Sequence, residues 1–374
     1  MKATTLLFVV ALLFKPLFAI EQDSALDLYQ PEKAISIQQA ELAFWSNKYQ
    51  ERPGEFTYLY KMAFAHDALF DLTADIRHLK KAEACYQTIL ENHPLDPAPV
   101  QRSLAQNYIS QHRFCDALEL ARQALEAGSN RRQTRLILCD LYGELGREVE
   151  QREMLMELAD QQDFAYLIRL AKWDDARGNL PSAIQRLEQA RSMAEASGSS
   201  SLKQWIYSNL GDFYGHAGKI KASETHYRLS LKENPADWYS MKGLAWIAYS
   251  HEKNTDKALA IIDKIKTSSM DPGIQLLRAE ILEYRGDRDR SHLIVGKMAE
   301  FLSQPEYGRM YSRFLCNYHI SQGNTARAMK LAESELAERS VPVAWDMLAS
   351  ALVSQNKYQE AQNISEATYL EQNL

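Results

Sequence analysis

The sequence lacks the residue patterns on which most enzymes depend. None of its nine histidines stands three or four residues from another, so no helix would present a pair of imidazoles to a metal ion. Neither a glycine-rich phosphate loop nor a Gly-x-Ser-x-Gly motif occurs. The sequence therefore predicts a protein that is not an enzyme and that holds no metal and no cofactor. An active site dispersed among several helices is the enzymatic alternative.

Cysteine is scarce as well. Cys85, Cys115, Cys139 and Cys316 are few for 374 residues and show no CxxC spacing, which excludes a disulfide-stapled scaffold. We interpret all four as buried thiols that act as small hydrophobic residues. Pairing between them in an oxidising compartment is the alternative.

The chain has no excess of positive charge. Its 43 Lys and Arg residues face 49 Asp and Glu residues, which gives a formal net charge of −6. Such a chain offers no broad basic surface to a phosphate backbone, so nucleic acid is not an expected partner. With 46% hydrophobic residues it has enough apolar surface to fold.

Long hydrophobic runs are missing except at the N-terminus. Lys2 precedes an apolar run over residues 6–14, which is followed by Lys15-Pro16 and the small residue Ala19. This order is typical of a secretory signal peptide, residues 1–19, cleaved after Ala19. The run is shorter than the roughly 20 residues that span a bilayer, so a retained anchor is the weaker alternative. We predict a periplasmic protein, or a secreted one in a eukaryote, with no stable membrane insertion after cleavage.

An internal repeat organises the rest of the chain. A small residue, in most cases preceded by leucine, recurs at Ala105, Cys139, Ala171, Gly211, Ala245, Ala279, Cys316 and Ala349, with steps of 34, 32, 40, 34, 34, 37 and 33. A second small residue follows about twelve positions later in most units, and small residues at such places let two helices approach closely. Between the two helices a turn residue can adopt the left-handed conformation, namely Gly146, Gly178, Gly218, Gly286, Gly323 or Asn356.

This pattern resembles the tetratricopeptide repeat family. The best unit contains Tyr207, Leu210, Gly211, Tyr214, Gly218, Ser223, Tyr227, Ser230 and Pro235, and the last unit also fits, with Trp345, Leu348, Ala349, Leu352, Tyr358 and Ala361. The resemblance covers about 320 residues. It implies an all-α protein, a right-handed superhelix of about eight to nine helix-turn-helix units. The unit over residues 132–163 departs from the pattern, because Gln151 occupies a small-residue position, and we expect imperfect stacking there.

The sequence suggests three parts after residue 19. Residues 20–54 are predicted to form a capping region, with a helix over residues 32–49 that covers the first unit; a short arm that docks on a partner is the alternative. Residues 55–196 form an N-terminal array, which begins with a helix over residues 56–70 and a long turn around residues 71–75. Residues 202–374 form a C-terminal array. The serine-rich stretch between the arrays, residues 196–201, is either a flexible joint or only a longer loop.

The resemblance also implies where a partner would bind. In the family the first helix of each unit lines the concave face, and that register places these residues inward: Trp205, Asp212, His216, Tyr239, Lys242, Trp246, Tyr249, Glu280, Glu283, Tyr284, Arg313 and Asn317. Aromatic residues among charges are typical of binding hot spots. Packing between helices is the alternative for each aromatic residue. Arg313 and Asn317 resemble part of a carboxylate-binding set, but Met347 stands where the next asparagine is expected, so a complete set is absent.

We therefore predict a non-catalytic scaffold, an accessory or assembly factor that binds an extended peptide or protein segment in the concave groove. The second hypothesis is a sensor subunit that binds a small ligand or glycan through the same aromatic residues.

Overall fold

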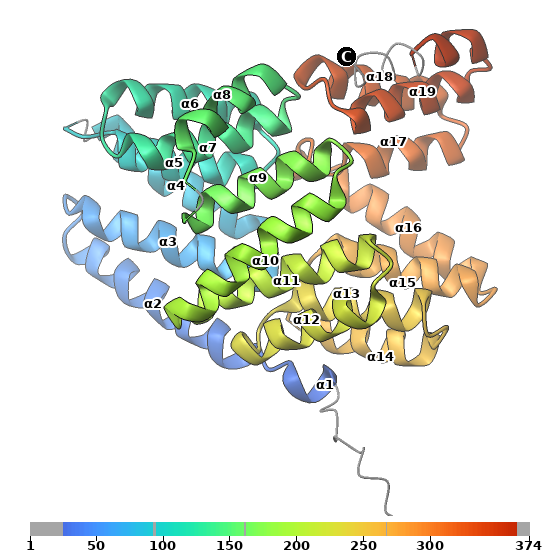
Figure 1. The fold of residues 1–374 in the computed structure, drawn as a ribbon, viewed down its shortest axis with the longest axis horizontal. Coiled ribbons are helices and arrows are strands. Elements are labelled where there is room, and N and C mark those ends of the chain that lie inside the picture. Colours follow the sequence, from blue (N-terminus) through green and yellow to red (C-terminus); the bar gives the residue numbers. More distant parts are fainter. Residues whose placement is uncertain (1–24, 93–94, 161, 267, 365–374) are drawn as a thin grey trace, which may run out of the picture.

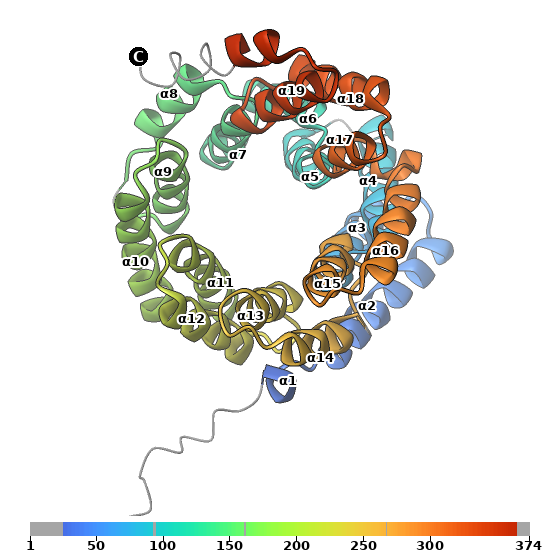
Figure 2. The same ribbon diagram turned by 90° about the vertical axis from the view of Figure 1, so that its right-hand side faces the viewer.

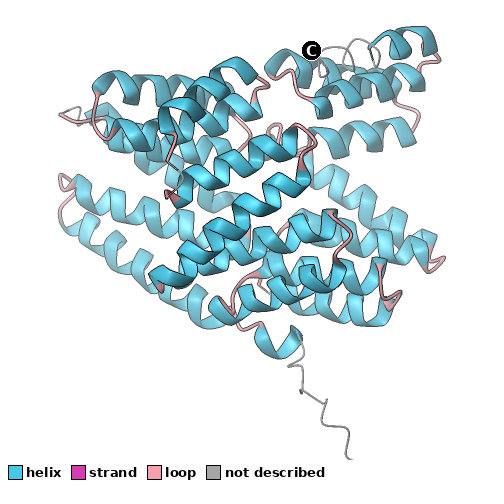
Figure 3. Ribbon diagram, in the orientation of Figure 1, coloured by secondary structure: helices cyan, strands magenta, loops and turns pink. Residues whose placement is uncertain are grey.

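The computed structural model describes residues 25–92, 95–160, 162–266 and 268–364. The predicted signal peptide, residues 1–19, lies outside them. Within the described residues the chain is all-α and contains no strand, as predicted, and Figure 3 shows helices joined by short loops. No helix in this part of the chain is both long enough and apolar enough to cross a membrane.

The described helices from α3 to α18 form antiparallel pairs with the predicted period, and α19 is the first helix of a further unit. The first helices of the pairs are α3 (Phe56–Thr73), α5 (Ala98–Ser110), α7 (Arg131–Glu144), α9 (Phe164–Ala176), α11 (Ser200–His216), α13 (Trp238–Ser250), α15 (Pro272–Tyr284), α17 (Ser312–Ser321) and α19 (Pro342–Ser354). The second helices are α4 (Ile76–Asn92), α6 (Phe114–Ala127), α8 (Glu148–Leu158), α10 (Leu180–Ser197), α12 (Ile220–Glu233), α14 (Thr255–Ile265), α16 (Arg288–Leu302) and α18 (Thr325–Glu338). The predicted eight to nine units are confirmed.

The turn inside each pair explains why the helices end where they do. Gly146, Gly178 and Gly218 have φ angles of 72°, 75° and 70°, and Gly286, Gly323 and Asn356 adopt the same left-handed conformation. An L-residue with a Cβ atom adopts this region at a cost, which favours glycine or asparagine in these six turns. In the other three turns Ala74, His112 and Lys253 adopt a positive φ angle. The second helix often begins at a capping side chain: the Asn179 side chain accepts a hydrogen bond from the Ser182 amide.

The small residues of the repeat are buried between the helices. Ala105, Cys139 and Ala171 are all 0% exposed. Each lets the two helices of a pair come together while leucine side chains fill the space around the contact. At the unit over residues 132–163, where we expected imperfect stacking, Gly143 makes the compensating space. A Cβ atom at Gly143 would lie 2.5 Å from Nε2 of Gln151.

Successive pairs rotate into a right-handed superhelix that surrounds a central axis (Figure 2). The first helix of each pair lies on the inner side, as α9, α11, α13 and α15 show clearly, and the second helix lies outside (Figure 2). The path makes a full turn, so the C-terminal helices α17 to α19 return to the vicinity of α4 to α7 (Figures 1 and 2).

Contacts between these distant parts of the chain close the superhelix. Ile76 and Leu79 of α4 share a buried cluster with Leu302, with Leu315 and with Tyr307 of the short helix η1 (Pro305–Tyr307). Polar contacts accompany it. The amide of Met270 donates to the carbonyl oxygen of Thr73 at 2.6 Å, Trp238 Nε1 donates to the carbonyl oxygen of Asp71 at 2.8 Å, and Arg339 pairs with Glu144 at 3.2 Å.

The end of α3 differs from the prediction, and the contact between Met270 and Thr73 lies at this end. The sequence placed a long turn around residues 71–75, but α3 continues to Thr73 and only Ala74 adopts the left-handed conformation before α4. Thr73 Oγ1 donates back to the carbonyl oxygen of Leu69, and the Thr73 carbonyl oxygen accepts from Met270. The contact with a residue about 200 positions away thus holds the last helical turn.

The N-terminal segment does more than cap the first unit. The predicted capping helix is α2 (Glu32–Glu51), which packs on α3, with Trp45 stacked on Tyr58 at 5.7 Å between ring centroids. The preceding α1 (Ala25–Leu28) lies against α12 and α14, which are far from it in the sequence (Figure 2). There Tyr29 is 0% exposed and its hydroxyl bonds Ser268 Oγ at 2.7 Å. The repeat pattern of the sequence does not predict this long-range contact.

The serine-rich stretch over residues 196–201 forms a tight turn. Helix α10 runs to Ser197, Gly198 has a φ angle of 69°, and the Ser199 side chain caps α11 from its first residue, Ser200. The 40-residue step therefore reflects two long helices, of 18 and 17 residues, rather than a longer loop. The boundary between an N-terminal and a C-terminal array stays a prediction.

The cysteines follow the prediction with one exception. Cys85, Cys139 and Cys316 are buried, and burial raises the pKa of the Cys139 thiol to about 12. Cys115, the second residue of α6, is exposed. Its backbone amide donates a hydrogen bond to the side chain of Glu338. The interpretation of all four as buried thiols was wrong for Cys115.

Candidate functional site

The candidate site lies on the inner side of the superhelix, where α11, α13 and α15 run side by side (Figures 1 and 2). A cavity of about 440 Å³ opens between them. Six of the residues predicted to face the groove line it, namely Asp212, His216, Tyr239, Lys242, Trp246 and Glu280. Its other lining residues are Gly215, Ser223, Tyr227, Gly243, Gly273, Leu276 and Leu277. The size is that of a typical small-molecule or side-chain site.

Tyr227 forms the back wall of this cavity. It comes from the outer helix α12 and inserts its ring between the two inner helices, against Gly211 of α11 and Gly243 of α13. A Cβ atom at Gly211 would lie 2.5 Å from Cδ1 of the ring, and one at Gly243 would lie 2.6 Å from Cε2. Glycine in a helix interior costs stability relative to alanine, so the space that these two glycines leave for Tyr227 is the physical reason for both.

Asp212 joins two tyrosines across the site. Its Oδ1 accepts from the Tyr227 hydroxyl at 2.5 Å and its Oδ2 accepts from the Tyr239 hydroxyl at 2.6 Å. Burial, and then the negative charge of Asp212, raise the pKa of Tyr227 and of Tyr239 far above the usual range. Both phenols therefore remain hydrogen-bond donors at neutral pH, and they fix Asp212 at the wall of the cavity.

Lys242 is held at the same wall. Its Nζ atom pairs with Asp271 at 3.1 Å and lies 5.1 Å from the ring centroid of Trp238 and 5.4 Å from that of Tyr239. A Cβ atom at Gly273 would lie 3.2 Å from this Nζ atom, so the glycine gives the ammonium group its room. The charge of Lys242 is thus already balanced by Asp271 and by two aromatic faces.

Beyond Lys242, three aromatic side chains are exposed on the inner helices. Tyr239, Trp246 and Tyr284 are 41%, 45% and 55% exposed. Tyr249 packs edge-on against Tyr284, with 5.4 Å between ring centroids, and burial, followed by the negative charge of Glu280, raises its pKa. Lys253 lies 5.8 Å from the Tyr284 ring centroid. This aromatic surface extends the cavity along α13 and α15.

The remaining predicted residues lie elsewhere. Trp205 packs edge-on against Phe164, with 6.0 Å between ring centroids, in the core between α9 and α11, as the packing alternative for this residue supposes. Arg313 and Asn317 of α17 are not part of the cavity. Arg313 pairs with Asp346 at 3.2 Å, and Asn317 lines a separate depression of about 500 Å³. Met347 is 2% exposed and packs near Cys316, so that position serves the core.

Sequence reasoning missed the wall of the cavity. The repeat pattern accounts for Tyr227 and Gly211 only as repeat residues, and it marks neither Gly243 nor Asp271. The available signal was a pair of glycines, Gly211 and Gly243, in the middle of two helices, where a glycine needs a close neighbour to justify its cost.

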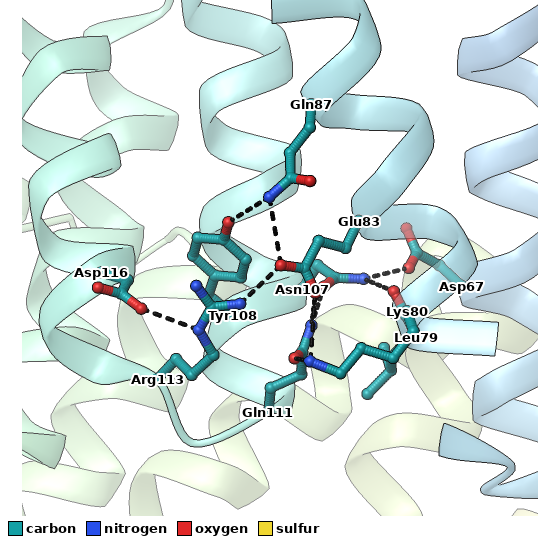
Figure 4. Close-up of polar contacts among 10 residues, drawn as sticks. All are labelled: Asp67, Leu79, Lys80, Glu83, Gln87, Asn107, Tyr108, Gln111, Arg113 and Asp116. Atoms are coloured by element: carbon teal, nitrogen blue, oxygen red, sulfur yellow. Dashed lines mark hydrogen bonds and ion pairs between the residues drawn. The ribbon is translucent and has the colours of Figure 1, made fainter. Parts of the chain in front are cut away.

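A second polar cluster lies between α3, α4 and α5, as Figure 4 shows. Asn107, which is 3% exposed, donates to Asp67 and to the carbonyl oxygen of Leu79. Gln111 donates to Asn107 and to Glu83, and Arg113 pairs with Glu83 and lies 3.8 Å from the Tyr108 ring centroid. Because these groups satisfy one another, they hold the three helices in register and leave no buried polar atom to recognise a ligand.

Metal binding has no counterpart in the described residues. No three of their His, Cys, Asp and Glu side chains lie close enough together to hold a metal ion. Asp212 and Glu280 belong to the same cavity, but the hydroxyl groups of Tyr227 and Tyr239 already occupy the Asp212 oxygens.

Comparisons with known proteins bear on the fold. No family model and no curated protein matches the sequence. Among solved structures, the chain is similar to the human IFIT1 dimer with PPP-AAAA, at 15% sequence identity over 88% of this chain and 77% of that one, with a TM-score of 0.51. It is also similar to a tetratricopeptide repeat protein from Parabacteroides merdae, at 18% identity over 70% of this chain and 97% of that one, with a TM-score of 0.44. A third match is PilF from Pseudomonas aeruginosa, at 16% identity over 56% and 94% of the two chains, with a TM-score of 0.42.

Identities of this size concern the fold alone. The helix pairs, their period and their turns show the repeat fold directly. The predicted resemblance is confirmed at that level, and the chain has the tetratricopeptide repeat fold.

Proposed function

We propose that this chain is a non-catalytic scaffold that binds an extended protein segment along its inner face, with the cavity between α11, α13 and α15 as the central contact. One observation carries the proposal: the exposed rings of Tyr239, Trp246 and Tyr284 gather beside a preformed cavity on the concave side. Aromatic side chains bury a large area at a small entropic cost, and they dominate the binding energy of many interfaces.

The surroundings support a prepared site. Asp212 is fixed by two hydroxyl donors and Lys242 by an ion pair, so little side-chain freedom remains to be lost on binding. A superhelical repeat also offers an elongated concave surface, which suits an elongated ligand.

Site-specific photocrosslinking in the native cell tests this proposal. A photoreactive phenylalanine in place of Trp246 should capture a protein partner that mass spectrometry identifies. The matched control is the same residue in place of Met156, which is 71% exposed on the outer helix α8. Equal capture from both positions, or none from position 246, would contradict binding in the groove.

A sensor that binds a small ligand or glycan is the second candidate. The cavity volume of about 440 Å³ favours it, since small-molecule sites commonly have this size. Thermal unfolding of the purified protein in the presence of a metabolite and glycan collection separates the two candidates. A sensor would show a ligand-dependent rise in melting temperature and no protein crosslink at position 246.

We also propose that nucleic acid is not the partner. The structures of human IFIT1 carry PPP-AAAA, but the likeness to this chain is one of fold. Asp212 and Glu280 line the present cavity, and two carboxylates would repel a phosphate chain. Filter binding of a labelled single-stranded RNA at low salt is the direct measurement, and binding that falls steeply with added salt would overturn this part.

Export completes the proposal. The N-terminal pattern supports a cleaved signal peptide over residues 1–19 and a periplasmic or secreted mature chain. N-terminal sequencing of the protein from fractionated cells should begin near Ile20. A start at Met1 in a membrane fraction would favour the retained anchor.

A further inference from the structure

The cavity carries more negative than positive charge that is free to act on a ligand. Two carboxylates, Asp212 and Glu280, line it. Within the described residues neither of them forms an ion pair, whereas Lys242, the cation at the wall, is paired with Asp271 at 3.1 Å. Burial, and then the negative charges of the nearby Asp212, Asp237 and Asp271, raise the pKa of Tyr239.

Glu280 is placed to meet a ligand directly. It is exposed on α15 and lines the same cavity as Trp246 of α13. Tyr249 follows Trp246 by three residues, so both side chains lie on neighbouring positions of one helix face. The charge of Glu280 raises the pKa of Tyr249 after burial does, which agrees with a carboxylate near this face of α13. A carboxylate offers about four acceptor positions, so Glu280 can accept from the donors of a ligand.

An exposed indole and a carboxylate in the wall of one cavity are a combination that binds organic cations. The ring face attracts a guanidinium or ammonium group, and the carboxylate accepts its N–H donors. Asp212 already accepts from two tyrosine hydroxyls, so it adds negative field and keeps fewer acceptor positions for those donors than a carboxylate without such bonds.

We propose that the cavity recognises a basic side chain, arginine or lysine, of the bound segment, stacked on Trp246 and paired with Glu280. This inference rests on the proposed function, because it names the part of the protein partner that enters the cavity. The occupant is a cationic side chain rather than an acidic one, since Lys242, the lysine of the wall, is already paired with Asp271.

The test uses the full-length mature protein labelled with 5-fluorotryptophan. The fluorine resonance of Trp246 is assigned with the Trp246→Phe variant, and the protein is titrated with Nα-acetyl-arginine amide. We expect a saturable shift of this resonance. Nα-acetyl-citrulline amide, which has nearly the same shape and no charge, and Nα-acetyl-glutamate amide should leave it unchanged at the same concentrations.

Two matched variants decide the role of the carboxylate. Glu280→Gln should weaken binding of the arginine probe by about tenfold, the size of effect expected when one charge-assisted hydrogen bond is lost. Glu283→Gln lies on the same helix, where Glu283 pairs with Arg288 outside the cavity, and should leave binding unchanged. Equal binding of arginine and citrulline probes, or an unchanged affinity in Glu280→Gln, would overturn the inference.

The result separates this inference from the proposed function. A protein crosslink at position 246 without any response to the arginine probe would keep the scaffold and reject the basic side chain. Absence of both would reject both. Preferential binding of the glutamate probe would instead assign the cavity to an acidic segment.

Discussion

The ring of Tyr227 lies so close to Gly243 that a Cβ atom on that residue would fall 2.6 Å from Cε2 of the ring. An outer helix thereby reaches through the inner layer and places a hydroxyl group on Asp212 at the wall of the cavity. The contact between Tyr227 and Gly243 therefore belongs both to the packing of the repeat and to the candidate site.

Replacement of Gly243 by alanine should disturb both. The added methyl group must displace the Tyr227 ring or separate α11 from α13, and overpacking of this kind costs about 1–3 kcal/mol of unfolding free energy. Chemical denaturation measures the loss. Gly296→Ala is the matched control, because Gly296 also lies inside a helix and the nearest atom to its added Cβ would be 4.0 Å away. The control should be neutral or gain about 0.5–1 kcal/mol. Similar losses in both variants would contradict the role given to Tyr227.

Removal of the Asp212 carboxylate should cost stability beyond the loss of a surface charge. In Asp212→Ala the hydroxyl of Tyr227, a residue that is 6% exposed, loses its acceptor, and an unpaired buried donor costs about 1–3 kcal/mol. Asp346→Ala breaks the exposed ion pair with Arg313 and should change the unfolding free energy by less than about 0.5 kcal/mol. If Asp212→Ala matched this control in urea denaturation, the tyrosine pair would not depend on Asp212.

Acid should destabilise the fold through a histidine pair between α3 and α4. His66 Nδ1 lies 2.9 Å from His78 Nδ1, and burial, followed by the charges of His78 and Lys81, lowers the pKa of His66 from 6.5 to about 4. Burial also lowers the pKa of His78, although Asp75 opposes this shift. Below pH 6.5 the histidine of the unfolded chain binds a proton that His66 of the folded chain does not. The contribution of His66 to the unfolding free energy is therefore fully present above this pH and is lost as the pH drops toward 4.

Urea denaturation at pH 7 and pH 5 measures this dependence. We expect the unfolding free energy to fall between the two values in the native protein and to fall less in His66→Asn, which removes the shifted group. His292→Asn replaces an exposed histidine and should leave the pH dependence unchanged. If the unfolding free energy depended equally on pH in all three proteins, the pair of His66 and His78 would not be the cause of this dependence.

Closure of the superhelix should depend on Gly146. A Cβ atom at this residue would collide with the carbonyl oxygen of Ser340, which precedes α19. Gly146→Ala should therefore separate α7 and α8 from α18 and α19, and amide hydrogen exchange in residues 342–354 should become faster. Gly178→Ala separates backbone strain from this collision, because Gly178 has nearly the same φ angle, 75° against 72°, and nothing within 4 Å of its added Cβ. Equal exchange in the two variants would show that the Ser340 contact does not hold the turns together.

The order of the helices followed from the sequence because the signals that specify them are local. The spacing from Ala105 to Cys139 and onward reports helix pairs that contact only their neighbours, and Gly218 or Asn356 marks a turn by its own backbone preference. The same register brought Asp212, Tyr239, Lys242, Trp246 and Glu280 to one cavity, although the pattern alone could not separate them from Trp205, which packs in the core.

The period of the sequence by itself determined an all-α repeat and the positions of its turns, since each depends on residues within about one unit. Only the tertiary structure decided that the superhelix closes, that Tyr29 docks on the distant helices α12 and α14, and that Tyr227 builds the cavity wall between Gly211 and Gly243. Closure depends on small rotations that add up over many repeats, and the contacts it creates, such as Arg339 with Glu144, join residues that no local pattern relates.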